Sequence, residues 1–225
     1  KKTPLANSYK KKKNIKEQHF PLSCILCKKC GHLQLEYLTN PKIIFEDYLY
    51  VSGTSKVLKK HFVDYAKKII SMFNLTNKSK ILDIACNDGT FLEYFKNKKF
   101  ENVVGVEPAQ NLRILNLKKK IDINTNFFNK KFSHVMKKKY KSFDLITANN
   151  VFAHSPHLYD FSQGVKNLLS TKGVFVLEVS YLPTVLTKKT FDTIYHEHMS
   201  YHALKPLVNF FKMQNLEVFD FQLVE

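Results

Sequence analysis

The sequence predicts an α/β fold with a parallel sheet covered by helices on both faces, preceded by a small cysteine-containing domain. From residue 80 onward, short apolar runs alternate with stretches of helical period, a pattern typical of parallel sheets. Residues 1 to about 46 differ, because they hold three of the four cysteines and three of the seven prolines. A chain of 225 residues fits one large domain with a small appendage. We expect a small N-terminal domain over 1–50 and the sheet domain over 51–225.

The individual elements follow from hydrophobic periodicity. Between 55 and 73 apolar residues recur every three or four positions, which predicts an amphipathic helix. Later apolar runs of four to six residues are typical of buried strands. The further expected elements, in chain order, are strand 81–85, helix 90–98, strand 103–106, helix 109–118, strand 143–148, helix 160–169, strand 174–179, helix 204–215 and strand 217–224.

The chain is strongly basic, with a formal net charge of +17, yet Arg113 is the one arginine among 36 basic residues. Proteins that read nucleic acids usually use the planar fork of arginine, so this composition disfavours a nucleic-acid partner. We interpret the runs Lys10–Lys13 and Lys137–Lys139 as solvated loops or helix faces. No apolar run is long enough to span a membrane and no signal segment begins the chain, so we expect a cytoplasmic protein.

The most informative stretch runs from Ile81 to Leu92, where a predicted strand passes through a turn directly into a helix. Small residues in such a turn let a ligand approach the backbone N–H groups of the helix start. The turn lacks both the dinucleotide fingerprint and the phosphate loop. Its pattern resembles the acidic-x-Gly-x-Gly-x-Gly loop of class I methyltransferases, with cofactor-binding positions at Asp83, Ala85, Asn87 and Gly89.

Two further segments extend this predicted cofactor site. Glu107 ends the next strand, at a spacing where a carboxylate accepts hydrogen bonds from the ribose hydroxyls of a nucleoside. The alternative is that Glu107 caps the following helix. Asn149 and Asn150 follow the strand at 143–148 and are candidate contacts to the methionine part of the cofactor, although one of them could be a turn former.

Cys27-Lys28-Lys29-Cys30-Gly31 forms a compact pair of thiols followed by a glycine that permits a tight turn. Two such thiolates supply half of a tetrahedral structural zinc site. We expect the other ligands upstream of Lys1, although Cys24 with His19 or His32 could contribute. Free thiols are the alternative, and a disulfide is disfavoured in the cytosol.

A histidine-rich stretch follows the strand predicted at 174–179. Tyr195, His196, Glu197 and His198 lie on a loop beyond the carboxyl end of a strand, where open parallel sheets present their ligands. Histidine and tyrosine exchange protons near neutral pH, and a carboxylate orients an imidazole. A metal site at the two histidines, or a loop in which Glu197 caps a helix, are the alternatives.

Taken together, these motifs carry a family resemblance. The Cys-x-x-Cys-Gly knuckle, Tyr-x-Tyr-x-Ser-Gly-Thr-Ser at 48–55, the Asn-Asp-Gly loop and Tyr-His-Glu-His at 195–198 occur in one order. That order resembles the zinc-containing sugar C-methyltransferases, which use S-adenosylmethionine to methylate nucleotide-diphospho 4-keto deoxy sugars. The resemblance implies a Rossmann-like class I methyltransferase sheet. Relative to that family, one knuckle at the N-terminus and a further C-terminal domain are missing, so we expect a truncated chain.

The resemblance also implies a mechanism and site residues. His198 would be the base that removes the proton next to the keto group, and Glu197 would orient it or contact the sugar. Tyr195, His196 and Tyr50 would hydrogen-bond the keto oxygen or relay the proton. Two other functions are weighed against this one: methylation of oxygen or nitrogen in a small molecule, and RNA binding by a zinc-knuckle module without catalysis. The first needs no carbon-acid base, and the second predicts a clustered aromatic platform that the sequence lacks.

Overall fold

We describe residues 1–6 and 16–224 from a computed structural model of the chain. The chain divides into two compact units, which we describe separately. The sheet unit comprises Phe45–Val151 and Tyr159–Glu178. The terminal unit comprises the described residues of Lys1–Ile44, Phe152–Leu158 and Val179–Glu225. The run Lys10–Lys13 lies outside the described residues. The domain boundary at residue 50 remains a prediction, because compactness in space and division into domains along the chain are different properties.

The sheet unit is built on five parallel strands in the order β7-β6-β5-β8-β9. The chain runs outward from β5 to β7 and then returns to place β8 on the other side of β5, so the strand order reverses between β5 and β8. Ligands of such sheets bind beyond the carboxyl ends of the strands at this reversal. The strands are β5 (Lys80–Ile84), β6 (Asn102–Val106), β7 (Asp122–Asn124), β8 (Phe143–Asn149) and β9 (Leu169–Glu178).

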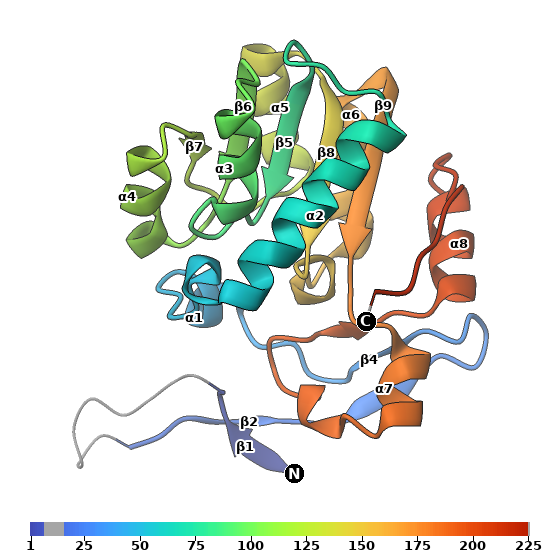
Figure 1. Cartoon of the computed structure of the whole chain (residues 1–225). Helices are drawn as coiled ribbons and strands as arrows, with labels where there is room; N and C mark the ends of the chain where they lie inside the picture. The colour runs from blue at the N-terminus through green and yellow to red at the C-terminus, as the bar shows by residue number, and fades with distance from the viewer. Residues whose placement is uncertain (7–15, 225) are drawn as a thin grey trace. The chain divides into compact units, whose positions relative to one another are not determined.

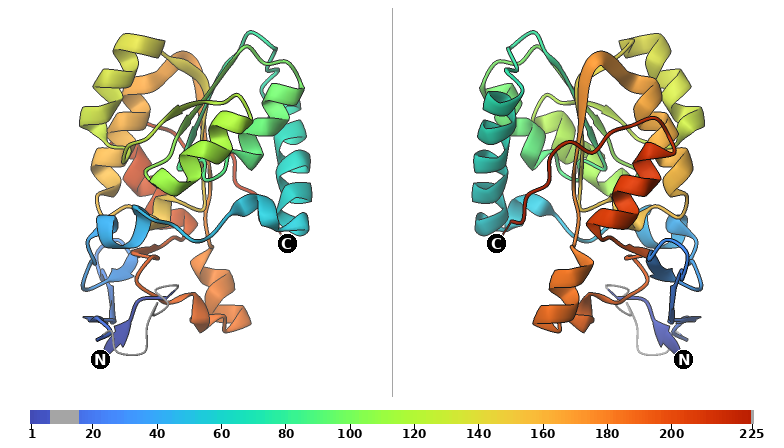
Figure 2. Two further views of the ribbon diagram at one scale, coloured as in Figure 1. Left: turned by 90° about the vertical axis from the view of Figure 1, so that its left-hand side faces the viewer. Right: turned by 90° about the vertical axis from the view of Figure 1, so that its right-hand side faces the viewer.

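Helices cover both faces of this sheet, as the sequence predicts. Figures 1 and 2 show α2 and α3 on one face and α5 and α6 on the other. The core beneath α2 and α3 is aromatic, with the rings of Phe62 and Phe91 edge-to-face at 5.4 Å. The helices are α2 (Lys56–Met72), α3 (Thr90–Asn97), α4 (Gln110–Lys118), α5 (Lys130–Tyr140) and α6 (Leu158–Leu168).

The terminal unit holds short strands and helices around a small core of Leu35, Leu182 and Tyr201. Strands β1 (Lys2–Pro4) and β2 (His19–Pro21) form an antiparallel pair. A second antiparallel sheet has the order β10-β4-β3. Its strands are β3 (Cys24–Leu26), β4 (Leu33–Leu35) and β10 (Ser200–Tyr201), and the remaining elements are η2 (Phe152–His154), α7 (Leu182–Lys188), η3 (Phe191–Thr193) and α8 (Leu204–Lys212). Helix α1 (Pro41–Phe45) ends where the sheet unit begins in the sequence.

The expected strand at 217–224 is wrong. These residues adopt no regular structure, and their large apolar side chains, including Phe219 and Leu223, are exposed. A strand needs a neighbouring strand to satisfy its backbone N–H and C=O groups, and no described strand pairs with this segment. The alternation of apolar residues is therefore present without the partner that a strand requires. None of the helices formed by the described residues is both long and apolar enough to cross a membrane.

Candidate functional site

The turn between β5 and α3 has a left-handed backbone conformation, which glycine adopts most easily. Ala85, Asn87 and Gly89 all have positive φ, at 55°, 53° and 75°. Residues with a Cβ are strained in this left-handed region, and asparagine tolerates it better than alanine. These are the three positions at which the class I loop pattern has glycine. The structure thus shows that the pattern reflects a backbone requirement, which Ala85 and Asn87 meet without being glycine.

Gly89 is required for space as well as for its backbone angle. A Cβ at this position would lie 2.4 Å from Cδ1 of Ile121 and 2.5 Å from Oδ1 of Asn116. Both neighbours are buried, so the contact could not be relieved at the protein surface. The start of α3 therefore packs directly against the segment that leads into β7.

Glu107 lies at the end of β6 with its carboxylate directed at the turn. Its Oε2 accepts a hydrogen bond of 2.8 Å from the backbone N–H of Asn87, and its Oε1 accepts one of 2.9 Å from Ala109. Burial raises the pKa of this carboxyl, and the two N–H donors oppose that shift. The bond to Ala109 is a local contact that precedes α4, whose N-cap has no side-chain hydrogen bond, so Glu107 does not cap the helix. The bond to Asn87 directs the carboxylate at the turn between β5 and α3.

Asp83, the next-to-last residue of β5, has a buried carboxyl group. Its Oδ1 accepts hydrogen bonds from the Thr147 hydroxyl at 2.6 Å and from Nδ2 of Asn149 at 3.2 Å. Burial raises the pKa of Asp83 to about 7, and the charge of Glu107 adds to the shift. Asn150 also has positive φ and donates to Oε1 of Glu178 at 2.7 Å. Of the two asparagines, Asn149 contacts Asp83, whereas Asn150 has the geometry of a turn former.

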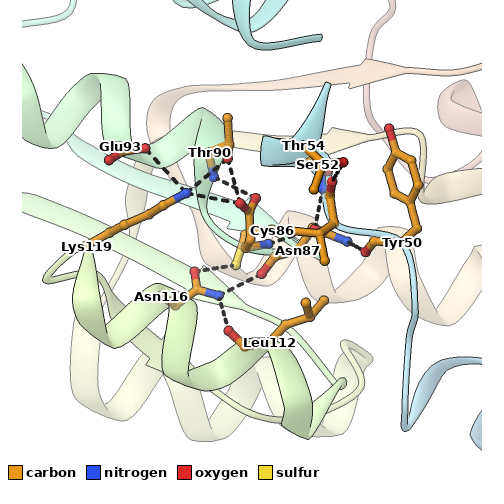
Figure 3. Close-up of polar contacts among 12 residues, drawn as sticks. Tyr50, Ser52, Thr54, Cys86, Asn87, Thr90, Glu93, Leu112, Asn116 and Lys119 are labelled. Carbon is orange, nitrogen blue, oxygen red and sulfur yellow. Dashed lines mark hydrogen bonds and ion pairs between the residues drawn. The ribbon is translucent and has the colours of Figure 1, made fainter. Parts of the chain in front are cut away.

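Asn87 joins the turn to the segment that contains Tyr50 (Figure 3). Its Oδ1 accepts from the backbone N–H of Ser52 and from that of Asp88, each at 2.9 Å, and its Nδ2 donates to the carbonyl of Tyr50 at 2.9 Å. The Tyr50 backbone is therefore held at the turn, while 48% of the residue is exposed.

Lys119 makes further polar contacts at the turn that the sequence does not predict. Lys119 lies 3.2 Å from Oδ2 of buried Asp88 and 3.3 Å from Glu93, and it donates to the Thr90 hydroxyl (Figure 3). It follows α4 among other lysines, so nothing in the sequence distinguishes it. Its ammonium neutralises the one carboxylate that would otherwise be buried at the start of α3 without a counter-ion.

The histidine-rich loop lies in the terminal unit between η3 and β10. Nδ1 of His198 lies 2.7 Å from the carbonyl of Thr193, so that nitrogen carries the proton. Nε2 is then unprotonated and accepts a hydrogen bond of 3.3 Å from the Tyr195 hydroxyl. Burial lowers the pKa of His198. The imidazole is thus neutral at neutral pH, with the acceptor nitrogen next to a tyrosine.

The other predicted residues of this loop have different surroundings. Burial and the charge of Glu197 raise the pKa of Tyr195 to about 12, so its hydroxyl stays protonated and is able to donate. Glu197 and His196 are buried. Nε2 of His196 lies 3.3 Å from the carbonyl of Phe20 in β2, which ties the loop to the N-terminal strands. The structure therefore brings Tyr195 and His198 together and gives His196 a contact of its own.

His154 is a member of this cluster that the sequence analysis missed. Its ring stacks on His198 with 5.2 Å between ring centroids and 21° between planes. Burial, together with His198, lowers the pKa of His154 to about 3. A histidine just beyond the strand predicted at 143–148 was the available signal. Tyr50 belongs to the sheet unit, whereas His154 and residues 195–198 belong to the terminal unit.

The Cys27–Cys30 knuckle has the local geometry of a thiolate pair. Gly31, at φ 76°, donates its N–H to the carbonyl of Cys27 and closes the turn. The N–H of Cys30 lowers the pKa of the Cys27 thiol, which favours the thiolate that binds zinc. Burial instead raises the pKa of Cys24. Within residues 1–6 and 16–224, no cluster of three metal-binding side chains forms. The two thiols fit one half of a zinc site.

Comparison with known proteins agrees with this geometry. Residues 57–220 match a family model described as a methyltransferase domain, and residues 1–45 match one described as "Putative zinc binding domain". The C-methyltransferase NovU of Streptomyces niveus is 29% identical over 204 residues, which cover 91% of this chain and 48% of NovU. The chain thus spans about half the length of this relative.

Solved structures of the plantazolicin methyltransferase BpumL in complex with SAH and desmethylPZN analogues share the fold. One superposes with a TM-score of 0.56 at 14% identity, over 73% of this chain and 66% of BpumL. Another gives 0.55 at 14% identity, over 69% and 62%. The five-stranded parallel sheet is the class I methyltransferase fold. With a family model matching most of its length, the chain belongs to the methyltransferase-domain family.

Proposed function

We propose that the chain is the cofactor- and acceptor-binding part of an S-adenosylmethionine-dependent C-methyltransferase. Its acceptor is the carbon next to the keto group of a nucleotide-linked 4-keto deoxy sugar. The observation that carries this proposal is the state of His198, which is a neutral imidazole whose unprotonated Nε2 accepts a hydrogen bond from the Tyr195 hydroxyl. Transfer to oxygen or nitrogen does not require a base that removes a proton from carbon, whereas transfer to carbon does.

In this proposal one group of residues removes the proton and stabilises the enolate, and a second group binds the cofactor. Nε2 of His198 takes the proton from the carbon next to the ketone, and the electron pair moves onto the keto oxygen to form an enolate. Tyr195, still protonated near neutral pH, donates a hydrogen bond to that oxygen. His196, Glu197 and Tyr50 complete the acceptor site. S-adenosylmethionine supplies the methyl group that the enolate carbon attacks. The cofactor is bound by residues of the sheet unit, with Glu107 on the ribose. These residues are Asp83, Ala85, Asn87, Gly89, Glu107, Asn149 and Asn150.

The decisive experiment separates proton removal from methyl transfer. The full-length protein is incubated in deuterated water with the keto sugar and S-adenosylhomocysteine, and exchange of the hydrogen next to the ketone is followed. His198→Asn should slow exchange by about 10²–10⁴-fold, the usual contribution of a general base. His157→Asn, at an exposed histidine of the same unit, is the control and should exchange like the wild type. Exchange at the wild-type rate in His198→Asn would remove this residue from the base role.

The pH dependence of exchange gives an independent readout. A base acts in its deprotonated form, so the rate should rise with pH until His198 is neutral and then stay level. Because burial lowers the pKa of His198, the rise should be centred below about 6.5, the ordinary value for histidine. A rise centred near the pKa of Tyr195, which is about 12, would point to a tyrosinate base instead.

We also infer that Cys27 and Cys30 supply two of the ligands of a structural zinc ion. The family match over residues 1–45 and the lowered pKa of the Cys27 thiol support this inference. A zinc ion held there would act on folding of the N-terminal segment and would take no part in methyl transfer.

A further inference from the structure

A cavity of about 310 Å³ lies within the terminal unit, with walls from the cysteine knuckle, β4, β10 and α8. Neither His154 nor any of residues 195–198 lines it. An apolar cavity of about 150 Å³ is large enough to hold benzene. This cavity therefore has room for a molecule of about two fused rings, at a place separate from the histidines of the proposed acceptor site.

His202, which directly follows β10, is a buried polar side chain in the wall of this cavity. The residue is 1% exposed, and neither Nδ1 nor Nε2 has a hydrogen-bond partner among the described residues. Other contacts fix its position, because its carbonyl accepts a bond of 2.7 Å from the N–H of Leu182 and its ring stacks on Phe152 at 5.2 Å. A buried polar group left without a partner is costly. Its ring nitrogens are therefore the groups that a molecule in the cavity would satisfy.

The cavity wall carries no charge. Burial, together with His32, lowers the pKa of His202 to about 3, so its imidazole is neutral and has one N–H donor and one acceptor nitrogen. No Asp, Glu, Lys or Arg is among the described residues that line the cavity. A charged ligand would lose its hydration here without gaining a counter-charge. A neutral hydroxyl fits, because it can donate to one ring nitrogen or accept from the other.

The remaining wall favours an aromatic body. Met199, Leu207 and Phe210 supply apolar surface, and thioethers and phenyl rings pack favourably against an aromatic ring. The Ser200 hydroxyl in the same wall lies 3.3 Å from Nε2 of His32, so these two polar groups already contact each other. The unpaired hydrogen-bonding capacity described here thus belongs to His202, and the rest of the site is suited to flat apolar surface.

We propose that this cavity binds a neutral aromatic alcohol. Its hydroxyl pairs with a ring nitrogen of His202, and its rings pack against Met199 and Phe210. The site goes beyond the proposed methyl transfer, because a nucleotide-linked sugar carries the negative charges of a diphosphate and this wall offers them no cation. His202 is then the residue that selects an alcohol over a hydrocarbon of the same shape.

Equilibrium dialysis of the full-length protein against three probes tests the proposal. 2-Naphthol has two fused rings and a hydroxyl, naphthalene has the rings alone, and 2-naphthoate has a charged carboxylate in place of the hydroxyl. At pH 7 the wild type should bind 2-naphthol about threefold to tenfold more tightly than naphthalene, as expected for one net hydrogen bond between neutral groups. It should bind 2-naphthoate more weakly than either.

His202→Phe keeps a ring of similar size and removes both nitrogens. It should lower the affinity for 2-naphthol to that for naphthalene and leave naphthalene binding unchanged. Because it also removes two buried, unpaired nitrogens, it should raise the midpoint of thermal unfolding of the unliganded protein. A histidine that served only to hold the fold together would lower the midpoint when replaced. His157→Phe, at an exposed histidine of the same unit, is the control and should change neither affinity.

Leu207→Phe locates the site independently of His202, because the larger side chain fills part of the cavity. Binding of 2-naphthol and of naphthalene should both be lost or strongly weakened. Leu186→Phe, on α7 of the same unit and 54% exposed, adds the same bulk outside the cavity and should bind both probes like the wild type.

Three results would overturn the proposal: a wild type that binds no 2-naphthol, a wild type that binds 2-naphthol no better than naphthalene, or folded His202→Phe and Leu207→Phe variants that bind 2-naphthol undiminished. The comparison of the three probes uses the wild type alone, so it decides the question even if neither variant folds. These measurements need neither S-adenosylmethionine nor a sugar, so their outcome is independent of the proposed function.

Discussion

At the scale of single residues, the candidate cofactor site combines strain with buried charge. Ala85 and Asn87 adopt left-handed backbone angles, and Asp83 is a carboxylate with little access to water. Both features destabilise the free protein. Their occurrence together in one turn is the arrangement expected of a binding site whose ligand offsets the cost.

Ala85→Gly should stabilise the protein. The substitution removes left-handed strain of about 1–2 kcal/mol and adds unfolded-state entropy of about 0.5–1 kcal/mol, for a net gain of about 0.5–1 kcal/mol. Urea unfolding measures this difference directly. Ala66→Gly, in the middle of α2, has no such strain to lose and should destabilise. A loss of stability in Ala85→Gly would contradict the strain that we assign to this position.

Asp83 should make the stability of the unliganded protein depend on pH. Its pKa in the folded state is about 7, above the value of about 3.9 for an unfolded chain. Between these values the folded state holds a proton that the unfolded state releases, so stability should fall as pH rises from about 4 to 7. Asp83→Asn should abolish this part of the loss, on the order of a few kcal/mol.

Thermal unfolding of both proteins at pH 5 and pH 8 is the measurement. The wild type should lose more stability than Asp83→Asn between the two pH values. Asp64→Asn, at an exposed aspartate of α2, should follow the wild type. Equal losses in wild type and Asp83→Asn would show that Asp83 is ionised in the folded protein near pH 5.

At the scale of elements, the turn after β5 organises its neighbours through side-chain contacts. Asn87 holds the segment 50–52, and the N-cap of α2 follows directly, where the Ser55 hydroxyl accepts from the N–H of Leu58 at 3.2 Å. Lys119, after α4, reaches the start of α3 at Asp88. The turn therefore connects α2, α3 and α4 at one end of the sheet.

Asn87→Gly tests this role without adding backbone strain, because glycine adopts positive φ freely. The variant loses the bonds to Tyr50 and Ser52, so amide hydrogen exchange at Ser52 should speed up and stability should fall by about 1–3 kcal/mol. Asn97→Gly, at the exposed end of α3, should leave exchange at Ser52 unchanged. Unchanged exchange in Asn87→Gly would show that other contacts hold the segment.

At the scale of the whole molecule, the two compact units divide the predicted site residues. The sheet unit holds the predicted cofactor residues and Tyr50, and the terminal unit holds residues 195–198, His154 and the Cys27–Cys30 knuckle. Segments far apart in the sequence build the terminal unit, since β10 pairs with β4. The predicted site residues are therefore distributed over both units.

A structural zinc ion at Cys27 and Cys30 would stabilise the N-terminal segment of the whole protein. Elemental analysis should find about one zinc per chain, and Cys27→Ser or Cys30→Ser should lower that content. Cys86→Ala removes a buried cysteine of the sheet unit and should keep the zinc. A folded full-length protein without zinc would refute the structural metal site.

The amino-acid pattern alone predicts the elements whose periodicity is strong and the turn whose residues are consecutive. Helix α2, the strands β5, β6 and β8, and the loop from Asp83 to Gly89 all lie where the apolar pattern and the loop motif place them. Local spacing suffices there, because the interacting residues are neighbours in the chain. The apolar pattern of the short strand β7 and of the lysine-rich helix α5 is too weak to predict these two elements from the sequence.

Tertiary structure alone decided which distant side chains meet. His154 stacks on His198, Tyr65 lies within the field of Asp83, and Lys119 pairs with Asp88. It also left 217–224 without a strand, although the apolar pattern there predicts one. The physical reason is common to these cases. A strand, an ion pair or a stacked ring depends on a partner, and spacing along the chain does not specify a partner that folding brings from elsewhere.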